Sequence, residues 1–466
     1  MDFPQPGRHR IRLFKTEGRA LLTLAAPILA AQLSQQVLAF IDTVMAGRVS
    51  ATDLAGVAVG TSLWGPLLLF IYGVMLAVTP LVAQLHGSGR TDETGPLVRR
   101  GMLVALPLVL VAILVLRNAE AVFTVMAVDP PIAVIATAYL KAISWGVPAA
   151  AFFFLLRNLS EGLGLARPSM LIGLASLPVN AALNYIFIYG KLGLPTLGGV
   201  GCGWATAITL WFMSGCMLFI IYRAKTYSAT HIFDLTKRRG LEGATQILRL
   251  GLPIGCSLLV EASIFTLIAL FLSPLGAYTV ASHQITLNYS SLIFMVPLSI
   301  SIAITIRVGH AIGKGRPDRA KLVSHTGLLV NALIALGTAG LTLLFAENIA
   351  RIYTSDSRVI AASVGLLYLN ALYQFSDAVQ VSAAAALRGY KDTRVPLLLV
   401  VVAYWVISLP VGYSLALTPV WGAPMGAKGF WISLIIGLSV AAILLGARLR
   451  RVERVSIIKK IGCDCI

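Results

Sequence analysis

Residues Pro396–Leu417 read PLLLVVVAYWVISLPVGYSLAL, a run of 22 residues without a charged side chain. A bilayer core about 30 Å thick is crossed by roughly 20 apolar residues in helical form, so this run is long enough to span it. Lipid offers no partner for backbone groups at a free strand edge, and a helix is therefore the expected form.

The composition extends this conclusion to the whole chain. Of its 466 residues, 58% are hydrophobic and only 12% are charged, and the mean hydropathy is +0.85. Soluble domains carry about 25% charged residues. So little charge does not cover the surface of a soluble protein of this length, and we expect an all-α integral membrane protein.

Other apolar runs of similar length predict eleven further spans, which gives six in each half of the chain. The twelve predicted spans are Ala20–Ala46, Leu54–Leu85, Leu97–Leu116, Ile132–Leu156, Ser169–Tyr189, Gly201–Tyr222, Ile247–Leu272, Tyr278–Ile306, Leu322–Phe345, Val359–Leu387, Pro396–Leu417 and Gly429–Leu449.

The distribution of basic residues tests this division independently, because cytoplasmic loops of membrane proteins are rich in Lys and Arg. With the N-terminus inside, 30 of the 37 Lys and Arg fall in inner segments or at the inner ends of spans, six fall in outer loops, and Lys141 alone lies deeper within a span. We therefore expect a multi-pass protein of the cell inner membrane with both termini in the cytoplasm. The net charge of +18 is then a consequence of topology, and no nucleic-acid partner is expected.

Short motifs recur between the two halves at a nearly constant offset. Six spans in each half make both halves enter the membrane from the same side, which predicts parallel repeats related by an axis along the membrane normal. The matches are Leu24–Ile28 with Leu250–Ile254, Gly87–Asp92 with Gly313–Asp318 and Gly203-Trp204 with Gly429-Phe430, all at an offset of 226, and Gly162 and Arg167 with Gly389 and Arg394 at 227.

The repeats predict a division into two bundles and two cytoplasmic segments. The N-terminal six-helix bundle covers 1–222 and the C-terminal one covers 241–450. A basic linker, 223–240, joins them, and 451–466 forms a cytoplasmic tail.

Three carboxylates lie inside the predicted spans: Asp42, Glu261 and Asp377. A charge at the bilayer centre costs about 2.5–3.5 kcal/mol even on the lenient insertion scale, so such residues usually serve a function. Glu261 and Asp377 fall near mid-depth by helical rise, whereas Asp42 lies towards the outer end of its helix. The structural alternatives are a surface pair of Asp42 with Arg48 and a snorkelling or paired role for Lys141.

Polar residues accompany these acids at helical spacing, as expected for faces that line a cavity or meet one another. The shared faces are Ser257, Glu261 and Phe265; Asn370, Tyr373, Asp377 and Gln380; Gln284, Asn288 and Ser291, continued by Phe294; Gln35 and Asp42; and Asn180 with Asn184.

Carboxylates in a poorly hydrated cavity suit the exchange of one cation for another. Desolvation favours the protonated form of a carboxyl group, and its ionised form holds Na⁺ with help from hydroxyls and amides. A cationic substrate competes for the same negative charge, and this competition is antiport. Phe265 and Phe294 could add cation–π contacts of about 0.5–2 kcal/mol, although aromatic residues in membrane helices usually serve packing.

Motifs for other chemistry are missing from the sequence. There is no G-x-x-x-x-G-K-[ST] phosphate loop, no H-E-x-x-H and no G-x-S-x-G, so neither ATP hydrolysis nor an enzyme is expected. An ion gradient must supply the energy, at about 2.3 kcal/mol per charge at 100 mV. The expected coupling ion is Na⁺ or H⁺, and no other cofactor is expected.

Five motifs in this order resemble those of the multidrug and toxic compound extrusion (MATE) transporters, specifically the NorM-like branch. The likeness covers almost the whole chain and rests on FIDTVMAG (40–47), GVGCGWAT (199–206), Pro253-Ile254 followed by Glu261-Ala262-Ser263, QFSD (374–377) and LRGY (387–390).

The resemblance implies a V-shaped pair of six-helix bundles that alternates between outward and inward openings. It implies export of amphipathic, often cationic, compounds in exchange for Na⁺ or H⁺. Glu261 and Asp377 match the cation-coupling acids of the second half, a possible Na⁺ site, whereas Asp42 and its polar partner Asn180 match those of the first. Some relatives carry Asp where this chain has Asn184, which shifts our expectation towards the second half.

The resemblance also implies substrate contacts. Gln284, Phe265 and Phe294 match positions that line the drug cavity, and Asp356 matches an acidic loop position near it. With Asn288 and Tyr373 from the polar faces, these residues form the predicted substrate-binding set.

Two other functions were weighed. A flippase for lipid-linked precursors tends to have a strongly cationic cavity, whereas here three intramembrane acids stand against one lysine. A membrane-embedded enzyme needs clustered catalytic groups, which the sequence does not contain. We therefore expect a transporter with the lipid bilayer and small cationic drugs as its partners, acting as a monomer.

Overall fold

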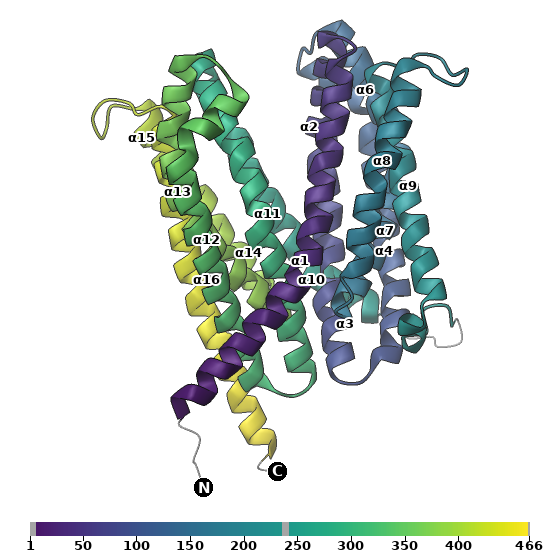
Figure 1. Cartoon of the computed structure of the whole chain (residues 1–466), viewed down its shortest axis with the longest axis vertical. Coiled ribbons are helices and arrows are strands. Elements are labelled where there is room, and N and C mark those ends of the chain that lie inside the picture. The colour runs from purple at the N-terminus through teal and green to yellow at the C-terminus, as the bar shows by residue number, and fades with distance from the viewer. Residues whose placement is uncertain (1–5, 235–241, 465–466) are drawn as a thin grey trace. The chain divides into compact units, whose positions relative to one another are not determined.

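The computed structural model describes residues 6–234 and 242–464, and within these ranges the chain is helical and contains no strand (Figure 1). The elements of the first half are α1 (Pro6–Gly47), α2 (Ala51–Leu76), α3 (Val78–Gly87), η1 (Thr91–Glu93), α4 (Thr94–Arg117), α5 (Ala119–Val125), α6 (Pro130–Ile143), η2 (Ser144–Gly146), α7 (Val147–Gly162), α8 (Arg167–Tyr189), α9 (Gly199–Arg223) and η3 (Lys225–Thr230). Those of the second half are α10 (Glu242–Leu272), η4 (Ser273–Leu275), α11 (Ala277–Gly313), α12 (Pro317–Tyr353), α13 (Ser357–Gly389), α14 (Arg394–Val401), η5 (Val402–Ser408), α15 (Leu409–Leu417) and α16 (Ala427–Asp464).

Twelve helical segments of the described chain are long and apolar enough to cross a membrane, which confirms the predicted number of spans. Several are compound. The second combines α2 and α3, the fourth combines α6, η2 and α7, and the eleventh combines α14, α15 and the π-helical stretch η5 between them. Apolarity marks only the part of a helix that lipid covers, so the helices run beyond the predicted ends. α16, for example, continues through the described part of the predicted tail.

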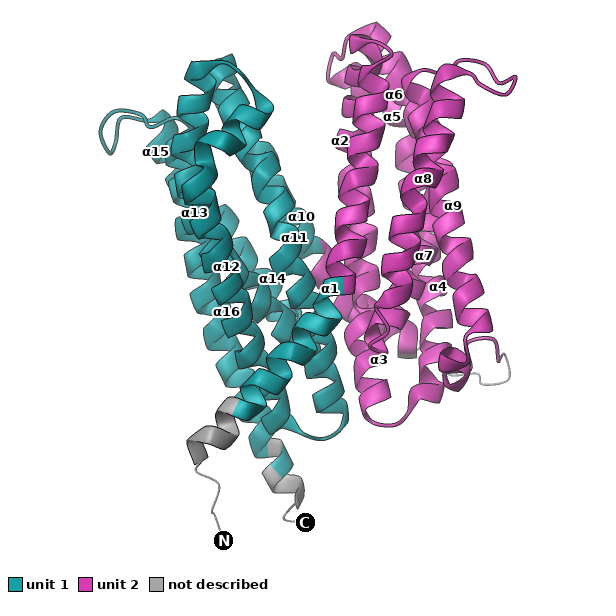
Figure 2. Ribbon diagram, in the orientation of Figure 1, with its two compact units in different colours: residues 1–26, 256–466 teal, residues 27–255 magenta. Residues whose placement is uncertain are grey.

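The described chain forms two compact units (Figure 2). Unit 1 comprises 1–26 and 256–466, and unit 2 comprises 27–255. The boundaries fall inside α1 and α10, each of which carries a proline close to its boundary, Pro27 and Pro253. The bundle division predicted from the repeats remains a prediction, and residues 235–240 of the predicted linker and 465–466 of the predicted tail lie outside the described residues.

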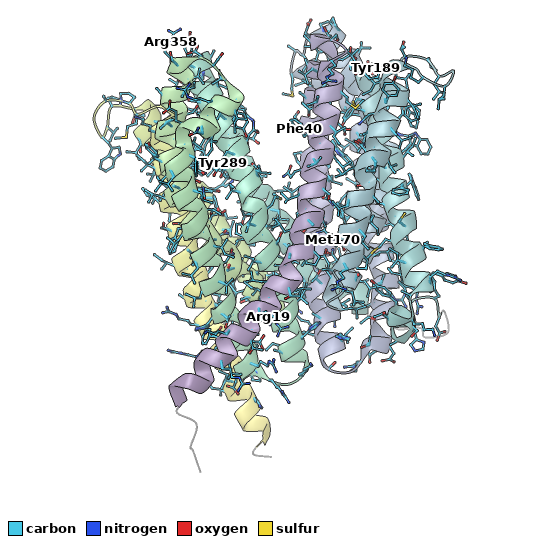
Figure 3. The ribbon with its side chains drawn as sticks, in the orientation of Figure 1. Arg19, Phe40, Met170, Tyr189, Tyr289 and Arg358 are labelled. Atoms are coloured by element: carbon cyan, nitrogen blue, oxygen red, sulfur yellow. The ribbon has the colours of Figure 1, made fainter. Side chains whose placement is uncertain are left out.

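Within unit 1, residues assigned to opposite sides of the membrane lie at opposite ends. In Figure 3, Arg358, predicted to be outside, lies at one end, and Arg19, predicted to be inside, lies towards the other. The core between these ends is built on α13, which packs against α11, α12 and α16. Small side chains on α13, such as the fully buried Ala383 and Ala386, allow the helices to approach closely, as is usual in membrane bundles.

The internal repeat is visible in equivalent contacts of the two units. A Cβ atom added to Gly162 would lie 2.8 Å from Val82, and one added to Gly389 would lie 2.7 Å from Val308. Each glycine therefore allows two helices to touch at the same place in its unit. The pairs correspond at offsets of 226 and 227, as the sequence predicted.

One of the sequence matches has the wrong register. Gly201 approaches the backbone nitrogen of Ile188 in unit 2, and Gly429 approaches that of Ala416 in unit 1. The equivalent residues are therefore 228 apart, whereas Gly203-Trp204 was paired with Gly429-Phe430 at 226. A glycine followed by an aromatic residue recurs by chance, and turns absorb single insertions that a constant offset misses.

Candidate functional site

The first candidate site is built around Asp42 of α1. Asn184 of α8 donates from Nδ2 to Asp42 Oδ1 at 2.6 Å, and Thr206 of α9 donates from Oγ1 to Asp42 Oδ2 at 2.7 Å. Both carboxylate oxygens are thus held by neutral donors from two neighbouring helices. The described residues form no ion pair between Asp42 and Arg48, so the surface pairing considered from the sequence is not present.

Asn180 acts on this acid through Asn184. Asn184 Nδ2 also donates to Asn180 Oδ1 at 3.1 Å, and Asn184 and Asn180 are 0% and 1% exposed. Within the described part of the chain, the buried Asn184 Oδ1 has no hydrogen-bond partner. The resemblance implied Asn180 as a polar partner of the acid, and the structure adds Asn184, one turn away, as a direct donor to it.

A cavity of about 200 Å³ opens beside Asp42 inside unit 2. Gln35 and Asp42 both line it, which confirms that they share one face of α1. The wall is otherwise largely aromatic and apolar, with Trp64, Tyr139 and Phe153 among its residues. These three come from α2, α6 and α7, so no periodicity within one helix could have identified them.

The second candidate site lies in unit 1, between α10 and α13. Gln380 donates from Nε2 to Glu261 Oε1 at 3.1 Å. Asp377 lies one turn before Gln380 on the same helix and is 6% exposed. In the described ranges, Glu261 and Asp377 form no ion pair with Arg, Lys or His, and Asp377 accepts no hydrogen bond.

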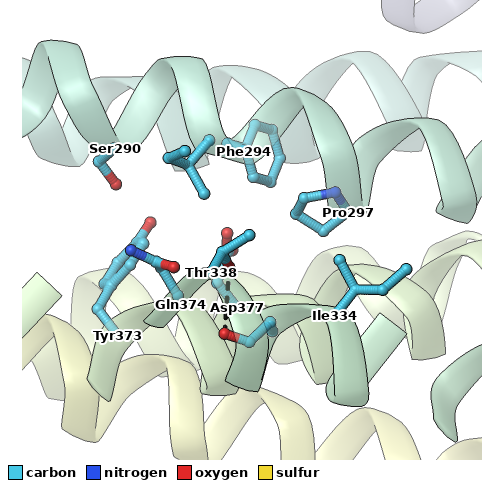
Figure 4. Close-up of a pocket in the computed structure, with 10 residues that line it drawn as sticks. Ser290, Phe294, Pro297, Ile334, Thr338, Tyr373, Gln374 and Asp377 are labelled. Carbon is cyan, nitrogen blue, oxygen red and sulfur yellow. Dashed lines mark hydrogen bonds between the residues drawn. The ribbon is translucent and has the colours of Figure 1, made fainter. Parts of the chain in front are cut away.

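A cavity of about 10 Å³ adjoins Asp377, room for about one water molecule (Figure 4). Tyr373, Asp377 and Phe294, three of the predicted site residues, line it together. Phe265 lies close by, with its ring centroid 6.5 Å from that of Tyr373. The structure therefore brings Phe265, Phe294 and Tyr373 to the acids of the second half.

The other predicted substrate contacts lie elsewhere in unit 1. Gln284 and Asn288 are exposed on α11, with a weak bond of 3.4 Å from Gln284 Nε2 to Asn288 Oδ1. Asp356 caps the start of α13 by accepting from the backbone nitrogen of Arg358 at 2.9 Å. None of the three lines the cavity beside Asp377, and their roles in binding remain predictions.

A buried polar network on α13 continues from this site. Gln374 donates to Asn370 Oδ1 at 2.9 Å and to Thr342 Oγ1 at 3.0 Å, and Asn370 donates to Ser290 Oγ at 2.8 Å. Gln374 Oε1 is buried without a partner among the described residues. The sequence placed Asn370 on the face of Asp377, but the bonds to α11 and α12 required the tertiary structure.

Unit 2 contains a buried ion pair that was not predicted from the sequence. Arg157 Nε and Glu161 Oε1 of α7 are 2.6 Å apart, and both side chains are 1% exposed. Arg157 also donates to Gln32 Oε1 of α1 at 3.0 Å. The spacing of four residues was an available signal, but the predicted span ended at Leu156.

A second buried acid ties the start of α1 to unit 1. Glu17, 2% exposed, accepts from Arg319 Nη2 at 2.6 Å and from Arg307 Nε at 3.1 Å. Lys141 is exposed and has no ion-pair partner among the described residues, so the snorkelling alternative describes it better than pairing does. The described residues contain no group of three or more His, Cys, Asp and Glu side chains that could hold a metal ion.

Comparisons with known proteins agree with one another. The model of the MatE family matches residues 27–186 and 253–414. The chain is 46% identical over 440 residues to Multidrug resistance protein NorM of Photobacterium profundum, covering 94% of this chain and 96% of that protein. It is 47% identical over 444 residues to Multidrug resistance protein MdtK of Yersinia pestis, again covering 94% of this chain and 96% of that protein.

Solved structures agree on the fold. The eukaryotic MATE transporter AtDTX14 superposes with a TM-score of 0.84 at 20% identity, covering 96% of this chain and 100% of that one. An outward-facing multidrug resistance MATE family transporter of the MOP superfamily gives 0.85 at 19% identity, covering 97% and 100%. With the family model matched in both halves and relatives that are similar over almost the whole length, this chain belongs to the MatE family.

Proposed function

We propose that this protein exports amphipathic, often cationic, compounds by antiport with Na⁺ or H⁺ through alternating access. The names of its relatives, NorM and MdtK multidrug resistance proteins, support efflux of drugs. Arg157 and Glu161 pair with each other, and the unpaired charges near the candidate sites are then the acids Asp42, Glu261 and Asp377, which favour cationic cargo over the phosphate groups that a flippase for lipid-linked precursors would carry.

One observation carries the proposal. Asp42, Glu261 and Asp377 lie inside membrane-spanning helices, and in the described chain none of them forms an ion pair with a basic side chain. The hydrogen bonds to Asp42 and Glu261 come from the neutral side chains of Asn184, Thr206 and Gln380. A permanent Arg or Lys partner would already occupy the negative charge. Without one, the charge is available to a proton, to Na⁺ or to a cationic substrate in turn.

We assign cation coupling to the acids of both sites and substrate contacts to the residues around them. Glu261 and Asp377 hold the coupling ion, because Asp377 adjoins a cavity large enough only for a water-sized occupant. Asp42 with Asn180 forms the coupling site of the first half, and the cavity of about 200 Å³ beside it suits an apolar or aromatic group of the cargo. Substrate contacts in unit 1 fall to Phe265, Phe294 and Tyr373 near the acids, and to Gln284, Asn288 and Asp356 further away.

The proposed setting is the cell inner membrane, with both termini in the cytoplasm. The excess of Lys and Arg in the segments assigned to the inside supports this orientation. The transporter acts as a monomer without a resident cofactor, and nucleic acid is not among its partners.

The test is drug efflux from vesicles reconstituted with the purified protein, with a Na⁺ gradient or a pH gradient imposed separately. We expect one gradient to drive export, and we expect Glu261→Gln and Asp377→Asn to abolish that export while eluting as folded protein in detergent. Glu347→Gln is the matched control, because Glu347 is an exposed acid paired with Arg351. Normal export by both site variants would show that these acids do not couple transport.

A further inference from the structure

A second, larger cavity lies in unit 2, apart from the two acidic sites. Its volume is about 590 Å³, and α5 and α6 form its walls. Figure 2 shows these two helices together at one end of unit 2. The lining includes one acid, Glu120 of α5, and one base, Lys141 of α6.

The polar groups of this cavity lack protein partners. In the described chain, Glu120 and Lys141 make no ion pair with each other or with any other residue. Thr137 lies one turn before Lys141 and is only 8% exposed, yet its hydroxyl makes no hydrogen bond within the described ranges. Thr124, on the opposite wall, instead donates to the carbonyl oxygen of Glu120 at 2.9 Å. Thr137 and Lys141 thus offer two adjacent free donors, and Glu120 offers a free acceptor.

The surroundings place the cavity at the surface of the membrane. Arg117 ends α4 and lies with its Cζ 4.8 Å from the centre of the Trp145 ring, one turn beyond Lys141. The lining residues from Glu120 to Pro130 lie between the third and fourth predicted spans, which end at Leu116 and begin at Ile132, and therefore at the headgroup level. A ligand reaching the cavity therefore arrives from the headgroup region.

We propose that this cavity binds the headgroup of a zwitterionic aminophospholipid. Lys141 and Thr137 receive the phosphate, and Glu120 receives the primary ammonium. The rest of the lining is largely apolar and includes Phe123 and Val134, the latter 70% exposed at the rim. These side chains suit the glycerol backbone and the first acyl carbons. One free acid and one free base in the same cavity match a ligand that carries both charges, whereas an anionic lipid would leave Glu120 opposed to its own charge.

The proposal is tested by lipid titration of the full-length protein in detergent, with bound lipids counted by native mass spectrometry. The probes are phosphatidylethanolamine, phosphatidylglycerol, which lacks the amine, and phosphatidylcholine, whose quaternary ammonium donates no hydrogen bond. We expect phosphatidylethanolamine to bind most tightly. Lys141→Gln should weaken both phosphatidylethanolamine and phosphatidylglycerol by at least roughly tenfold, because a charge-assisted bond to phosphate is lost.

The second part of the lipid-binding test uses Glu120. Glu120→Gln should weaken phosphatidylethanolamine by about tenfold or more and leave phosphatidylglycerol unchanged or slightly tighter. Val134→Trp, at an exposed rim position that tolerates a large side chain, should reduce retention of all three lipids. Lys191→Gln is the matched control, because Lys191 is an exposed lysine outside this cavity whose Nζ lies 5.9 Å from the centre of the Tyr185 ring.

The outcomes are decisive. Equal binding of phosphatidylethanolamine and phosphatidylglycerol by the unaltered protein would overturn the proposal. So would unchanged phosphatidylethanolamine binding in Glu120→Gln, which would mean that the site recognises phosphate alone. Lipid counting does not depend on transport, so these results stand whether or not the protein exports drugs.

Discussion

The buried pair of Arg157 and Glu161 allows a direct measurement of what burial adds to an ion pair in this protein. Glu161→Gln removes the negative charge and leaves a guanidinium that is 1% exposed with only neutral acceptors, such as the Gln32 carboxamide oxygen at 3.0 Å, among the described residues. Breaking a buried pair on one side costs about 3–5 kcal/mol, because the surviving charge has neither water nor a counter-ion. We expect a loss of this size in the free energy of unfolding.

The chain contains a matched control. Glu347 and Arg351 of α12 are also four residues apart with a closest N–O distance of 2.6 Å, but their side chains are 60% and 63% exposed. Water replaces the partner of an exposed charge, so Glu347→Gln should lower the free energy of unfolding by less than about 1 kcal/mol. The two pairs share residue types, spacing and distance, and they differ in burial and in the order of acid and base along the helix.

The assay is reversible unfolding in mixed detergent micelles, followed by helical circular dichroism as the fraction of denaturing detergent rises. The double variant Arg157→Met/Glu161→Leu should recover most of the stability lost in Glu161→Gln, because it leaves no uncompensated charge. Equal losses for Glu161→Gln and Glu347→Gln would refute the reasoning, and so would a double variant as unstable as the single one.

Three further predictions use the same assay or the efflux assay. Lys391 has a φ of 63°, a left-handed backbone conformation that glycine adopts more easily than lysine. Burial also lowers the pKa of its ammonium group. Lys391→Gly should therefore raise the free energy of unfolding by about 1 kcal/mol. Since the charged form is disfavoured in the folded state, this gain should shrink as the pH rises towards the ordinary lysine value of 10.5, and a gain that grows with pH would contradict it. Gly389→Ala places a Cβ atom 2.7 Å from Val308 of a neighbouring helix and should lower the free energy of unfolding by about 1–3 kcal/mol. Gly337→Ala, whose added Cβ atom meets nothing within 4 Å, should be neutral or slightly stabilising. Equal effects of the two variants would show that the close approach of the helices does not matter. Gln380→Leu removes the 3.1 Å hydrogen bond to Glu261. It should change the apparent affinity for the coupling ion in vesicles and leave the yield of folded protein intact. An unchanged affinity would mean that this hydrogen bond does not position Glu261 for ion binding.

Much of the local organisation could be predicted from the chain alone. Hydropathy and the distribution of basic residues identified all twelve spans, because lipid imposes the same length and composition on every crossing helix. Helical periodicity placed Gln35 with Asp42, and Tyr373 with Asp377, since residues three and four apart share a face whatever surrounds the helix.

Contacts between helices were beyond such reasoning. Asn184 and Thr206 hydrogen-bond to Asp42, and Arg157 hydrogen-bonds to Gln32. These contacts depend on the rotation and depth at which separate helices pack. Hydropathy does not determine rotation or depth, because many arrangements bury the same apolar area in lipid.

The sequence by itself therefore determined which segments enter the membrane and which acids go with them, because the cost of placing charge in lipid acts on each helix separately. Only the tertiary structure decided which neutral side chains hold those acids and which charges are left without a partner, because these depend on distances between residues far apart in the chain.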